Sequence, residues 1–464
     1  MALSPSRSAA FDILMGVEQG AFADELLHSE RLDALSVADR RLCTEIVMGV
    51  LRWRSQLDQT IASCSKAPPS KFDLEVATAL RMGAYQLTHL ERVPAHAAVD
   101  QTVELVKRAR RRFAAPMVNA VMRRLAAAKP VPPGSPTQGD SLDLLAAATA
   151  HPVWLLQRWS NRYGGEAARH IAQYDQQVPV PALRLRDPAA ENDSRNEGIE
   201  LAPGALLAAA RRVISGEVTG TRVFADGHVY LQDEASQLVG LLVGCGACLL
   251  DCCAAPGGKT SLLAERNPSA LVVAAELHPR RARLMRRLVH ARNVCIVVGN
   301  AEALPFMPNF DRVLVDVPCS GTGTLARNPE IKWRLRPEDL SDLHRRQVSI
   351  LCSALSYLVR GGRLVYSTCS LEREENENVV AEVLGGRNDL RLLDCRDELQ
   401  RLKAKGELVW PELDSLICGK FLRTLPGIHP CDGFFAAIIE KGHGSARIVT
   451  NDSQPGSVTI RANP

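Results

Sequence analysis

The sequence of 464 residues predicts two domains of different class, an all-α domain followed by an α/β domain with a mostly parallel sheet. Two patterns indicate this division. Through residues 1–130, apolar residues recur every three or four positions, as on one face of a helix. From about residue 226, short runs rich in Val, Ile and Leu alternate with helical segments, which is typical of strands covered on both faces.

The helical pattern begins near the N-terminus and stops at a Pro/Gly-rich break at 129–139, which we interpret as a linker. The helices expected before it are 9–17, 42–51, 76–87, 97–106 and 117–125. Residues 140–225 are mixed and predict a connecting subdomain, with a helix near 152–163 and a strand at 211–215. The α/β domain is predicted at 226–442, and 443–464 is expected to be a flexible tail.

Composition and charge narrow the class of protein. A hydrophobic share of 46% with 23% charged residues is typical of a soluble globular protein, and no apolar run is long enough to span a bilayer. Without an export signal, the 13 cysteines are expected to be reduced thiols in the cytoplasm. Residues 1–130 hold 18 basic against 14 acidic side chains, whereas the remainder holds 38 of each. A basic run, Lys107, Arg108, Arg110, Arg111 and Arg112, is either a solvated helix face or a contact for an anionic partner.

The α/β domain places its unusual residues after strands, where ligands bind in sheets of this kind. Its expected strands are 248–251, 271–276, 294–298, 312–317, 363–367 and 434–439. After the first comes Asp251-Cys252-Cys253-Ala254-Ala255-Pro256-Gly257-Gly258-Lys259-Thr260, whose small residues let the backbone approach a ligand closely. A phosphate-binding P-loop is excluded because Cys253 stands where its first glycine is required. The Gly321-Thr322-Gly323 spacing is discounted because Pro329 follows too soon for a long helix.

Polar residues after the next two strands indicate a nucleoside-containing ligand. Glu276 ends the second strand, where a carboxylate can accept hydrogen bonds from both hydroxyls of a ribose. Asn300 follows the third strand and either contacts an adenine edge or simply forms a turn.

Two cysteines close the fourth and fifth strands, in Asp316-Val317-Pro318-Cys319-Ser320-Gly321 and Ser367-Thr368-Cys369-Ser370. Both lie in polar loop sequence on the expected ligand side of the sheet. Other cysteines are expected to pack in the core: Cys43, Cys64, Cys295, Cys352 and Cys395. Cys245 and Cys248 have a ligand-like spacing but no second pair, so we expect no metal site.

Together these motifs resemble those of the RNA 5-methylcytosine methyltransferases, and among them the bacterial ribosomal small-subunit RNA methyltransferase B family. The resemblance covers essentially the whole chain. In the α/β domain it rests on the 251–260 and 316–321 segments and on 328–333, 366–370 and 432–435. Residues 1–130 resemble a NusB-like RNA-binding domain at 39–41, 49–54, 80–87, 92–99 and 118–120. The resemblance implies a Rossmann-like class I methyltransferase fold for the second domain.

The resemblance also assigns site residues. It implies that S-adenosylmethionine is bound by Cys253, Ala254, Ala255, Pro256, Gly257, Gly258, Lys259, Glu276, Asn300 and Asp316. The family usually has Asp at positions 276 and 300; Glu276 and Asn300 keep an acceptor oxygen. Cys369 is implied as the nucleophile on cytosine carbon 6, and Cys319 as the cysteine that assists product release. Asp316 is expected to hold the N3/N4 edge of the base, and Lys259 to lower a cysteine pKa.

The resemblance implies methyl transfer to carbon 5 of a cytosine in a loop or bulge of 16S ribosomal RNA. The protein is expected to be a monomer that does not associate with a membrane. One alternative retains this chemistry with tRNA or another RNA as the substrate. A second is a non-catalytic RNA-binding factor, which the intact cysteines and cofactor loop disfavour. Residues 140–225 are interpreted as guiding the substrate.

Overall fold

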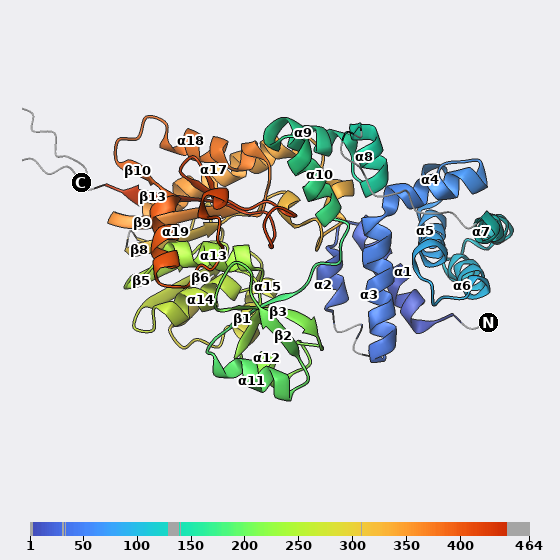
Figure 1. Cartoon of the computed structure of the whole chain (residues 1–464), viewed down its shortest axis with the longest axis horizontal. Coiled ribbons are helices and arrows are strands. Elements are labelled where there is room, and N and C mark those ends of the chain that lie inside the picture. The colour runs from blue at the N-terminus through green and yellow to red at the C-terminus, as the bar shows by residue number, and fades with distance from the viewer. Residues whose placement is uncertain are drawn as a thin grey trace, which may run out of the picture.

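The computed structural model describes residues 3–29, 32, 34–128, 139, 141–307 and 309–442. Except for Gly139, the predicted linker at 129–139 lies outside the described residues, as does the predicted tail at 443–464. Figure 1 shows a helical domain at one end of the molecule and an α/β domain at the other, as predicted. None of the helices in the described part of the chain combines the length and apolar character needed to cross a bilayer.

The N-terminal domain is all-α. Its helices are α1 (Pro5–Glu18), α2 (Ala23–Leu27), α3 (Val37–Arg52), α4 (Arg54–Ser65), α5 (Leu74–His89), α6 (Ala95–Arg108) and α7 (Ala115–Ala128), with short 3₁₀ turns η2 (Pro69–Lys71) and η3 (Arg112–Ala114). The Ser36 hydroxyl caps α3 by accepting from the Asp39 amide at 3.1 Å. A Cβ at Gly49 would lie 1.9 Å from the Tyr85 ring, so this glycine lets α3 and α5 approach closely. The predicted helices are confirmed; α2 and α4 were not predicted.

The mixed segment forms two small units. Helices α8 (Leu142–Thr149), α9 (Val153–Tyr163) and α10 (Gly165–Tyr174) come first. An antiparallel sheet of order β2-β3-β1-β4 follows. Its elements are β1 (Ala182–Leu185), α11 (Ala189–Asn196), β2 (Glu200–Pro203), β3 (Ala210–Ser215), α12 (Arg222–Ala225) and β4 (Val229–Leu231).

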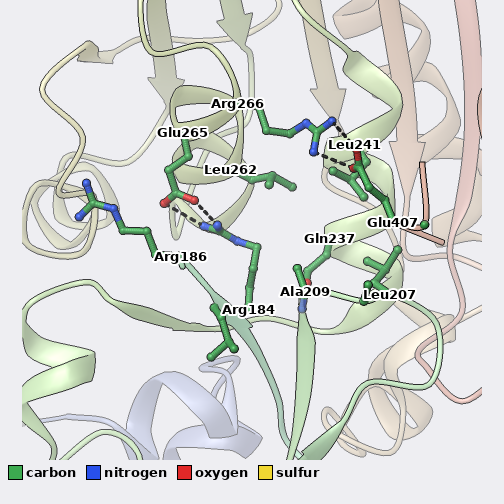
Figure 2. Close-up of a pocket in the computed structure, with 13 residues that line it drawn as sticks. Arg184, Arg186, Leu207, Ala209, Gln237, Leu241, Leu262, Glu265, Arg266 and Glu407 are labelled. Atoms are coloured by element: carbon green, nitrogen blue, oxygen red, sulfur yellow. Dashed lines mark hydrogen bonds and ion pairs between the residues drawn. The ribbon is translucent and has the colours of Figure 1, made fainter. Parts of the chain in front are cut away.

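Ion pairs join this small sheet and a later loop to the α/β domain, around a cavity of about 310 Å³ (Figure 2). Arg184 of β1 pairs with Glu265, and Arg266 pairs with Glu407 at 2.7 Å. Two of the three arginines that line this cavity are therefore paired with carboxylates.

The large sheet has the order β11-β12-β13-β9-β8-β5-β6-β7, with β10 beside β13. Its strands are β5 (Cys248–Asp251), β6 (Leu271–Glu276), β7 (Val294–Val298), β8 (Phe310–Asp316), β9 (Leu358–Thr368), β10 (Leu390–Leu393), β11 (Ile417–Cys418), β12 (Phe421–Arg423) and β13 (Phe435–Lys441). The neighbouring strands β9, β8, β5, β6 and β7 are all parallel, whereas β10, β11, β12 and β13 pair antiparallel, β13 also with β9. The sheet is therefore mixed, and the expectation of a mostly parallel sheet holds only for the part formed by β5 to β9.

Helices cover both faces of this sheet, and each face has its own apolar core. The helices are α13 (Glu234–Val243), α14 (Gly258–Arg266), α15 (Pro279–Leu288), α16 (Ile331–Arg334), α17 (Asp339–Tyr357), α18 (Glu377–Leu384) and α19 (Cys395–Ala404), with 3₁₀ turns η4 (Thr322–Thr324), η5 (Arg373–Glu375) and η6 (Leu413–Leu416). Since β5, β6, β8 and β9 run parallel, their carboxyl ends meet at one edge, and the loops that follow them converge there.

Candidate active site

The loop after β5 is fixed by its neighbours in the sheet. The Cys252 amide donates to the Leu314 carbonyl at 2.9 Å, and the Ala254 amide donates to the Ala275 carbonyl at 3.0 Å. Gly257 has φ of 111° and precedes α14, and a Cβ there would lie 2.6 Å from Val289 Cγ2. The glycine thus allows a left-handed turn that aims the first turn of α14, with Lys259, at the strand ends.

Asp251 lies beneath this loop and is 1% exposed. Its Oδ2 accepts from the Thr260 hydroxyl at 2.7 Å, while Oδ1 has no hydrogen-bond partner among the residues that the structure describes. Burial raises the pKa of Asp251 to about 7. The end of β5 therefore carries a buried carboxyl group beneath the loop that begins α14.

Glu276 and Asn300 lie after neighbouring strands, as predicted, but differ in exposure. Glu276 is 5% exposed; its Oε1 accepts from the His278 amide at 2.8 Å, and its Oε2 lies 4.0 Å from an Arg281 nitrogen. Asn300 is exposed, and its Oδ1 accepts from the Glu302 amide at 3.1 Å. The turn predicted as one interpretation of Asn300 is therefore present, and its contact with adenine stays a prediction.

The two strand-end cysteines meet. Cys319 Sγ and Cys369 Sγ are 3.3 Å apart, although 50 residues separate them in sequence. The hydrogen bond with Cys369, together with burial and the nearby Glu375 carboxylate, raises the pKa of Cys319 well above its ordinary value. The Cys319 thiol therefore stays protonated at neutral pH and can donate to the Cys369 sulfur.

Lys259 and Asp316 form an ion pair beside the thiols. Lys259 Nζ lies 2.7 Å from Asp316 Oδ2, and the Ser367 hydroxyl donates to Asp316 Oδ1 at 2.6 Å. Burial lowers the pKa of Lys259, but the Asp316 carboxylate and the nearby Cys369 sulfur outweigh it, so the pKa is raised. The charged form of Lys259 is thus favoured near Cys369, and the face of Phe434 lies 5.2 Å from its Nζ.

A buried carboxylate that sequence reasoning missed links the two cysteine loops. Glu375 Oε1 accepts from the Ser320 amide at 2.8 Å and from Gln347 Nε2 at 2.9 Å. Its Oε2 accepts from the hydroxyls of Ser320 and Ser370. Ser320 follows Cys319 and Ser370 follows Cys369, so one side chain sets the relative position of both thiols. The charged run 372–377 directly after the Thr-Cys motif was the available signal.

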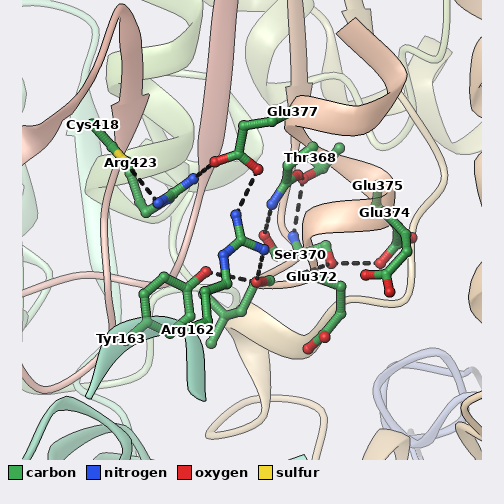
Figure 3. A network of polar contacts seen from close by, with 12 residues as sticks. Arg162, Tyr163, Thr368, Ser370, Glu372, Glu374, Glu375, Glu377, Cys418 and Arg423 are labelled. Atoms are coloured by element: carbon green, nitrogen blue, oxygen red, sulfur yellow. Dashed lines mark hydrogen bonds and ion pairs between the residues drawn. The ribbon is translucent and has the colours of Figure 1, made fainter. Parts of the chain in front are cut away.

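Helix α9 holds the same loop from outside (Figure 3). The Leu371 carbonyl accepts from Arg162 at 2.7 Å and from the Tyr163 hydroxyl at 2.6 Å. Arg162 also pairs with Glu377 at 2.6 Å, and Trp159 Nε1 donates to Glu372 at 3.1 Å. The segment 153–163 thus buttresses the Cys369 loop.

The segment 328–333 docks the helical domain. Trp333 Nε1 donates to the Leu51 carbonyl at 2.6 Å, and Lys332 Nζ donates to the Arg52 carbonyl at 3.1 Å. Both carbonyls belong to the last turn of α3, which leaves such groups without helical partners. The Glu330 carboxylate accepts from the Ala23 amide at 3.0 Å. The chain that carries Cys319 therefore continues directly into the contact between the domains.

Glycines explain two further motifs. Gly323 donates to the Cys369 carbonyl at 2.9 Å and accepts from the Gly433 amide at 2.7 Å; a Cβ on it would lie 2.1 Å from the Gly433 oxygen. Gly321-Thr322-Gly323 therefore serves close backbone packing against the 432–435 segment, in agreement with discounting it as a dinucleotide motif. Asp432 of that segment pairs with Arg327 at 2.9 Å.

A groove of about 400 Å³ opens beside the cysteine loops, lined by Ser320, by Phe22 of the helical domain and by residues of α16 and α17. Phe22 is 48% exposed and lies over the Arg334 guanidinium, 5.5 Å from it. Both domains therefore line this groove, next to Ser320, the residue that follows Cys319.

The expectation that five cysteines pack in the core needs correction. Cys43 and Cys395 are buried and Cys64 is half-buried, but Cys295 and Cys352 are exposed, so the core prediction is wrong for these two. The strand β7 that carries Cys295 is an edge strand, and Cys352 lies on the solvent face of α17.

Comparisons with known proteins agree with this architecture. Residues 244–440 match the family described as 16S rRNA methyltransferase RsmB/F, and residues 4–127 match the NusB family. A probable ribosomal RNA small subunit methyltransferase B of Bacillus subtilis (strain 168) is 32% identical over 454 residues, which cover 94% of this chain and 98% of the relative. The chain belongs to the ribosomal RNA small subunit methyltransferase B family.

Another member of the methyltransferase B family, from Escherichia coli (strain K12), is 31% identical over 92% of this chain and 96% of its own length. Among solved structures, PH0851 has a TM-score of 0.77 at 20% identity and covers 95% of this chain and 100% of its own. A methyltransferase homolog protein from Pyrococcus horikoshii has a TM-score of 0.52 at 26% identity, covering 65% of this chain and 98% of its own. The predicted fold, a NusB-like domain joined to a Rossmann-like methyltransferase domain, is confirmed.

Proposed function

We propose that this protein transfers a methyl group from S-adenosylmethionine to carbon 5 of a cytosine in 16S ribosomal RNA, through a covalent bond between Cys369 and carbon 6. The observation that carries the proposal is the 3.3 Å contact between the Cys319 and Cys369 sulfurs, beside the Lys259–Asp316 pair. Two thiols at the ends of adjacent strands, next to a cofactor-type loop, fit a reaction with a covalent step and a separate release step.

Cys369 is the nucleophile in this proposal. Carbon 5 of cytosine is a weak nucleophile, and attack of the Cys369 thiolate on carbon 6 makes it enamine-like. The Lys259 ammonium and the protonated Cys319 thiol both stabilise negative charge on the Cys369 sulfur. Cys319 cannot easily be the thiolate itself, because its pKa is raised.

Asp316 receives the base. Its two oxygens hold Lys259 and Ser367, and each retains a lone pair that can accept from N3–H or N4–H of a cytosine. Protonation at N3 compensates the electrons that enter the ring when the sulfur–carbon bond forms. Uracil offers a carbonyl at position 4, which Asp316 would repel.

Cys319 acts in the release step. The Cys319 thiol, adjacent to the leaving sulfur, gives its own proton to the Cys369 sulfur as the bond from Cys369 to carbon 6 breaks, and it takes up the proton that leaves carbon 5. The double bond between carbons 5 and 6 re-forms, and both thiols end protonated.

The cofactor pocket fits its ligand in two respects. Gly257 and Gly258 let the backbone approach a ligand closely. Glu276 Oε2 has only a weak ion-pair contact, 4.0 Å from the exposed Arg281, and so remains able to accept from a ligand hydroxyl. Glu276 would hold the ribose, residues 253–259 the methionine part, and Asn300 the adenine edge. S-adenosylmethionine supplies the electrophilic methyl group when bound.

The choice of ribosomal RNA is supported by the printed names of relatives that this chain matches over nearly its full length. The groove bordered by Phe22 and Ser320 is where an unstacked target nucleotide could enter, so a loop or bulge is the expected substrate.

The test uses 16S ribosomal RNA transcribed with 5-fluorocytosine, whose fluorine cannot leave as the proton does. We expect wild-type protein with S-adenosylmethionine to form a complex that survives denaturing gel electrophoresis. Cys369→Ala should form none while binding the cofactor normally. Absence of a wild-type complex, or its persistence in Cys369→Ala, would contradict the proposal.

A further inference from the structure

Helix α15 and the turn after it carry an uninterrupted basic surface. Six arginines lie between Glu276 and Glu302, and no acidic residue does. They are Arg280, Arg281, Arg283, Arg286, Arg287 and Arg292, and all are exposed. Among the described residues, the ion pairs of this set comprise only the 4.0 Å contact between Arg281 and Glu276. We call these six residues the α15 arginines.

The basic run 107–112 differs in this respect. Lys107 pairs with Glu104 at 2.7 Å, Arg108 with Asp12 at 2.7 Å, and Arg111 with Glu75 at 3.1 Å. A carboxylate next to a cation reduces the local positive potential that attracts a phosphate, so a paired cation offers a polyanion less than an unpaired one. The run that stands out in the sequence is therefore largely neutralised in the fold, whereas the α15 arginines are not.

The α15 arginines lie beside the cofactor loop. The opposite stripe of the helix is apolar, and Ala282 and Met285 are buried there with Ala254 packed nearby. Just beyond the helix, Val289 approaches Gly257, and His290 approaches Gly227 of the small sheet. Residues 289–290, which follow α15 (Figure 1), thus link the cofactor loop to the small-sheet segment, and the α15 arginines are exposed to solvent.

We propose that the α15 arginines bind the phosphate backbone of the RNA substrate, so that the catalytic domain itself supplies the main electrostatic contact. The inference rests on the proposed function, because it requires RNA as the substrate. Guanidinium groups match phosphate oxygens with paired donors, and six of them without competing carboxylates leave a surface complementary to a polyanion.

The test compares two triple variants that remove the same charge. One is Arg283→Gln/Arg286→Gln/Arg287→Gln on α15, which spares Arg281 beside Glu276. The matched control is Lys107→Gln/Arg108→Gln/Arg111→Gln in the helical domain. The probe is protein-free 16S ribosomal RNA, and its Kd is measured against the full-length proteins at several salt concentrations. Thermal unfolding and the S-adenosylmethionine Kd check that each variant is folded.

We expect the α15 variant to flatten the slope of log affinity against log salt by about 2 to 3, since each lost phosphate contact changes it by roughly 0.7–0.9. Its Kd for RNA at 0.1 M salt should rise at least about ten-fold, and its Kd for the cofactor should not change. The control should change the slope by less than about 0.9, the change expected for the loss of one phosphate contact. An Arg→Lys triple variant at the same α15 positions should largely restore the slope.

A folded α15 variant with the wild-type slope would overturn the inference while leaving the proposed function intact. An equal effect of the control would also overturn it, because long-range charge would then explain the result. If wild-type protein did not bind the RNA, the proposed function itself would fail and the inference with it.

Discussion

Replacing Glu375 by Gln tests whether one buried carboxylate sets the distance between the two thiols. The Gln side chain has nearly the same shape and keeps an acceptor for the Ser320 amide and for Gln347. At the other oxygen it places an NH₂ group against the Ser320 and Ser370 hydroxyls, which now donate to the carboxylate. Both hydroxyls must reorient so that they accept from this NH₂ group, and none of the four hydrogen bonds is then made to a charged group.

The magnitude follows from that change. A hydrogen bond to a charged group contributes about 1.5–3 kcal/mol and a neutral one about 0.5–1.5 kcal/mol, so four bonds lose roughly 4–6 kcal/mol in total. Burial of the carboxylate, which raises the pKa of Glu375, offsets part of this because the variant no longer desolvates a charge. We expect the free energy of unfolding to fall by about 1–2 kcal/mol. Misplacement of reacting groups by about 1 Å can cost about a hundredfold in rate, so we expect kcat to fall about ten- to a hundredfold.

The assay measures kcat for RNA methylation, the rate of adduct formation with 5-fluorocytosine RNA, and the S-adenosylmethionine Kd. Glu375→Gln should lower the first two and leave the third unchanged, because Glu375 contacts the cysteine loops and not the 253–259 loop. Glu374→Gln is the matched control, since that carboxylate pairs with Arg158 and is 35% exposed. Normal kcat in Glu375→Gln, or an equal loss in the control, would refute the reasoning.

Three further changes probe the cofactor site and the domain contact. Glu276→Ala should weaken S-adenosylmethionine binding by about ten- to a hundredfold, equivalent to roughly 1.5–3 kcal/mol; calorimetry showing an unchanged Kd would make Glu276 a purely structural residue. The pKa of Asp251 is raised to about 7 in the folded protein, so its contribution to stability is present below about pH 4 and is lost as the pH rises through about 7. Asp251→Asn should therefore flatten the fall of the unfolding free energy over this window, and a curve parallel to wild type would contradict the burial argument. Trp333→Phe removes the hydrogen bond to the Leu51 carbonyl and should cost about 1–3 kcal/mol of stability; equal thermal unfolding of variant and wild type would exclude this contact as a determinant of docking.

Much of the fold followed from sequence pattern because the chain uses local signals consistently. Periodicity placed α1, α3, α5, α6 and α7, and the apolar runs placed the parallel strands. The short α2 was not predicted, because it spans little more than one turn and so shows too little periodicity. The antiparallel edge escaped because β11 and β12 are two and three residues long and are defined by their partners across the sheet.

The candidate site residues that lie in recognisable sequence motifs could be predicted, whereas those whose role depends on tertiary contacts could not. Sequence order alone placed Cys319 and Cys369 at strand ends, and parallel pairing of β8 with β9 brings them together. Glu375 resembles any residue of a charged run, and only its burial reveals its role. For the run at 107–112 the sequence left both interpretations open, because two of its acidic partners, Asp12 and Glu75, come from distant helices.

The central claim is that Cys369 attacks the base and Cys319 releases it, and the most direct measurement is the adduct formed by Cys319→Ala with unmodified 16S ribosomal RNA. With S-adenosylmethionine present, this variant should accumulate a protein–RNA complex that survives denaturing electrophoresis, because elimination and not attack is impaired. The Cys319→Ala/Cys369→Ala double variant should accumulate none, since the attacking sulfur is gone. Rapid turnover without an adduct in Cys319→Ala, or an adduct that persists in the double variant, would contradict the assignment of the two thiols.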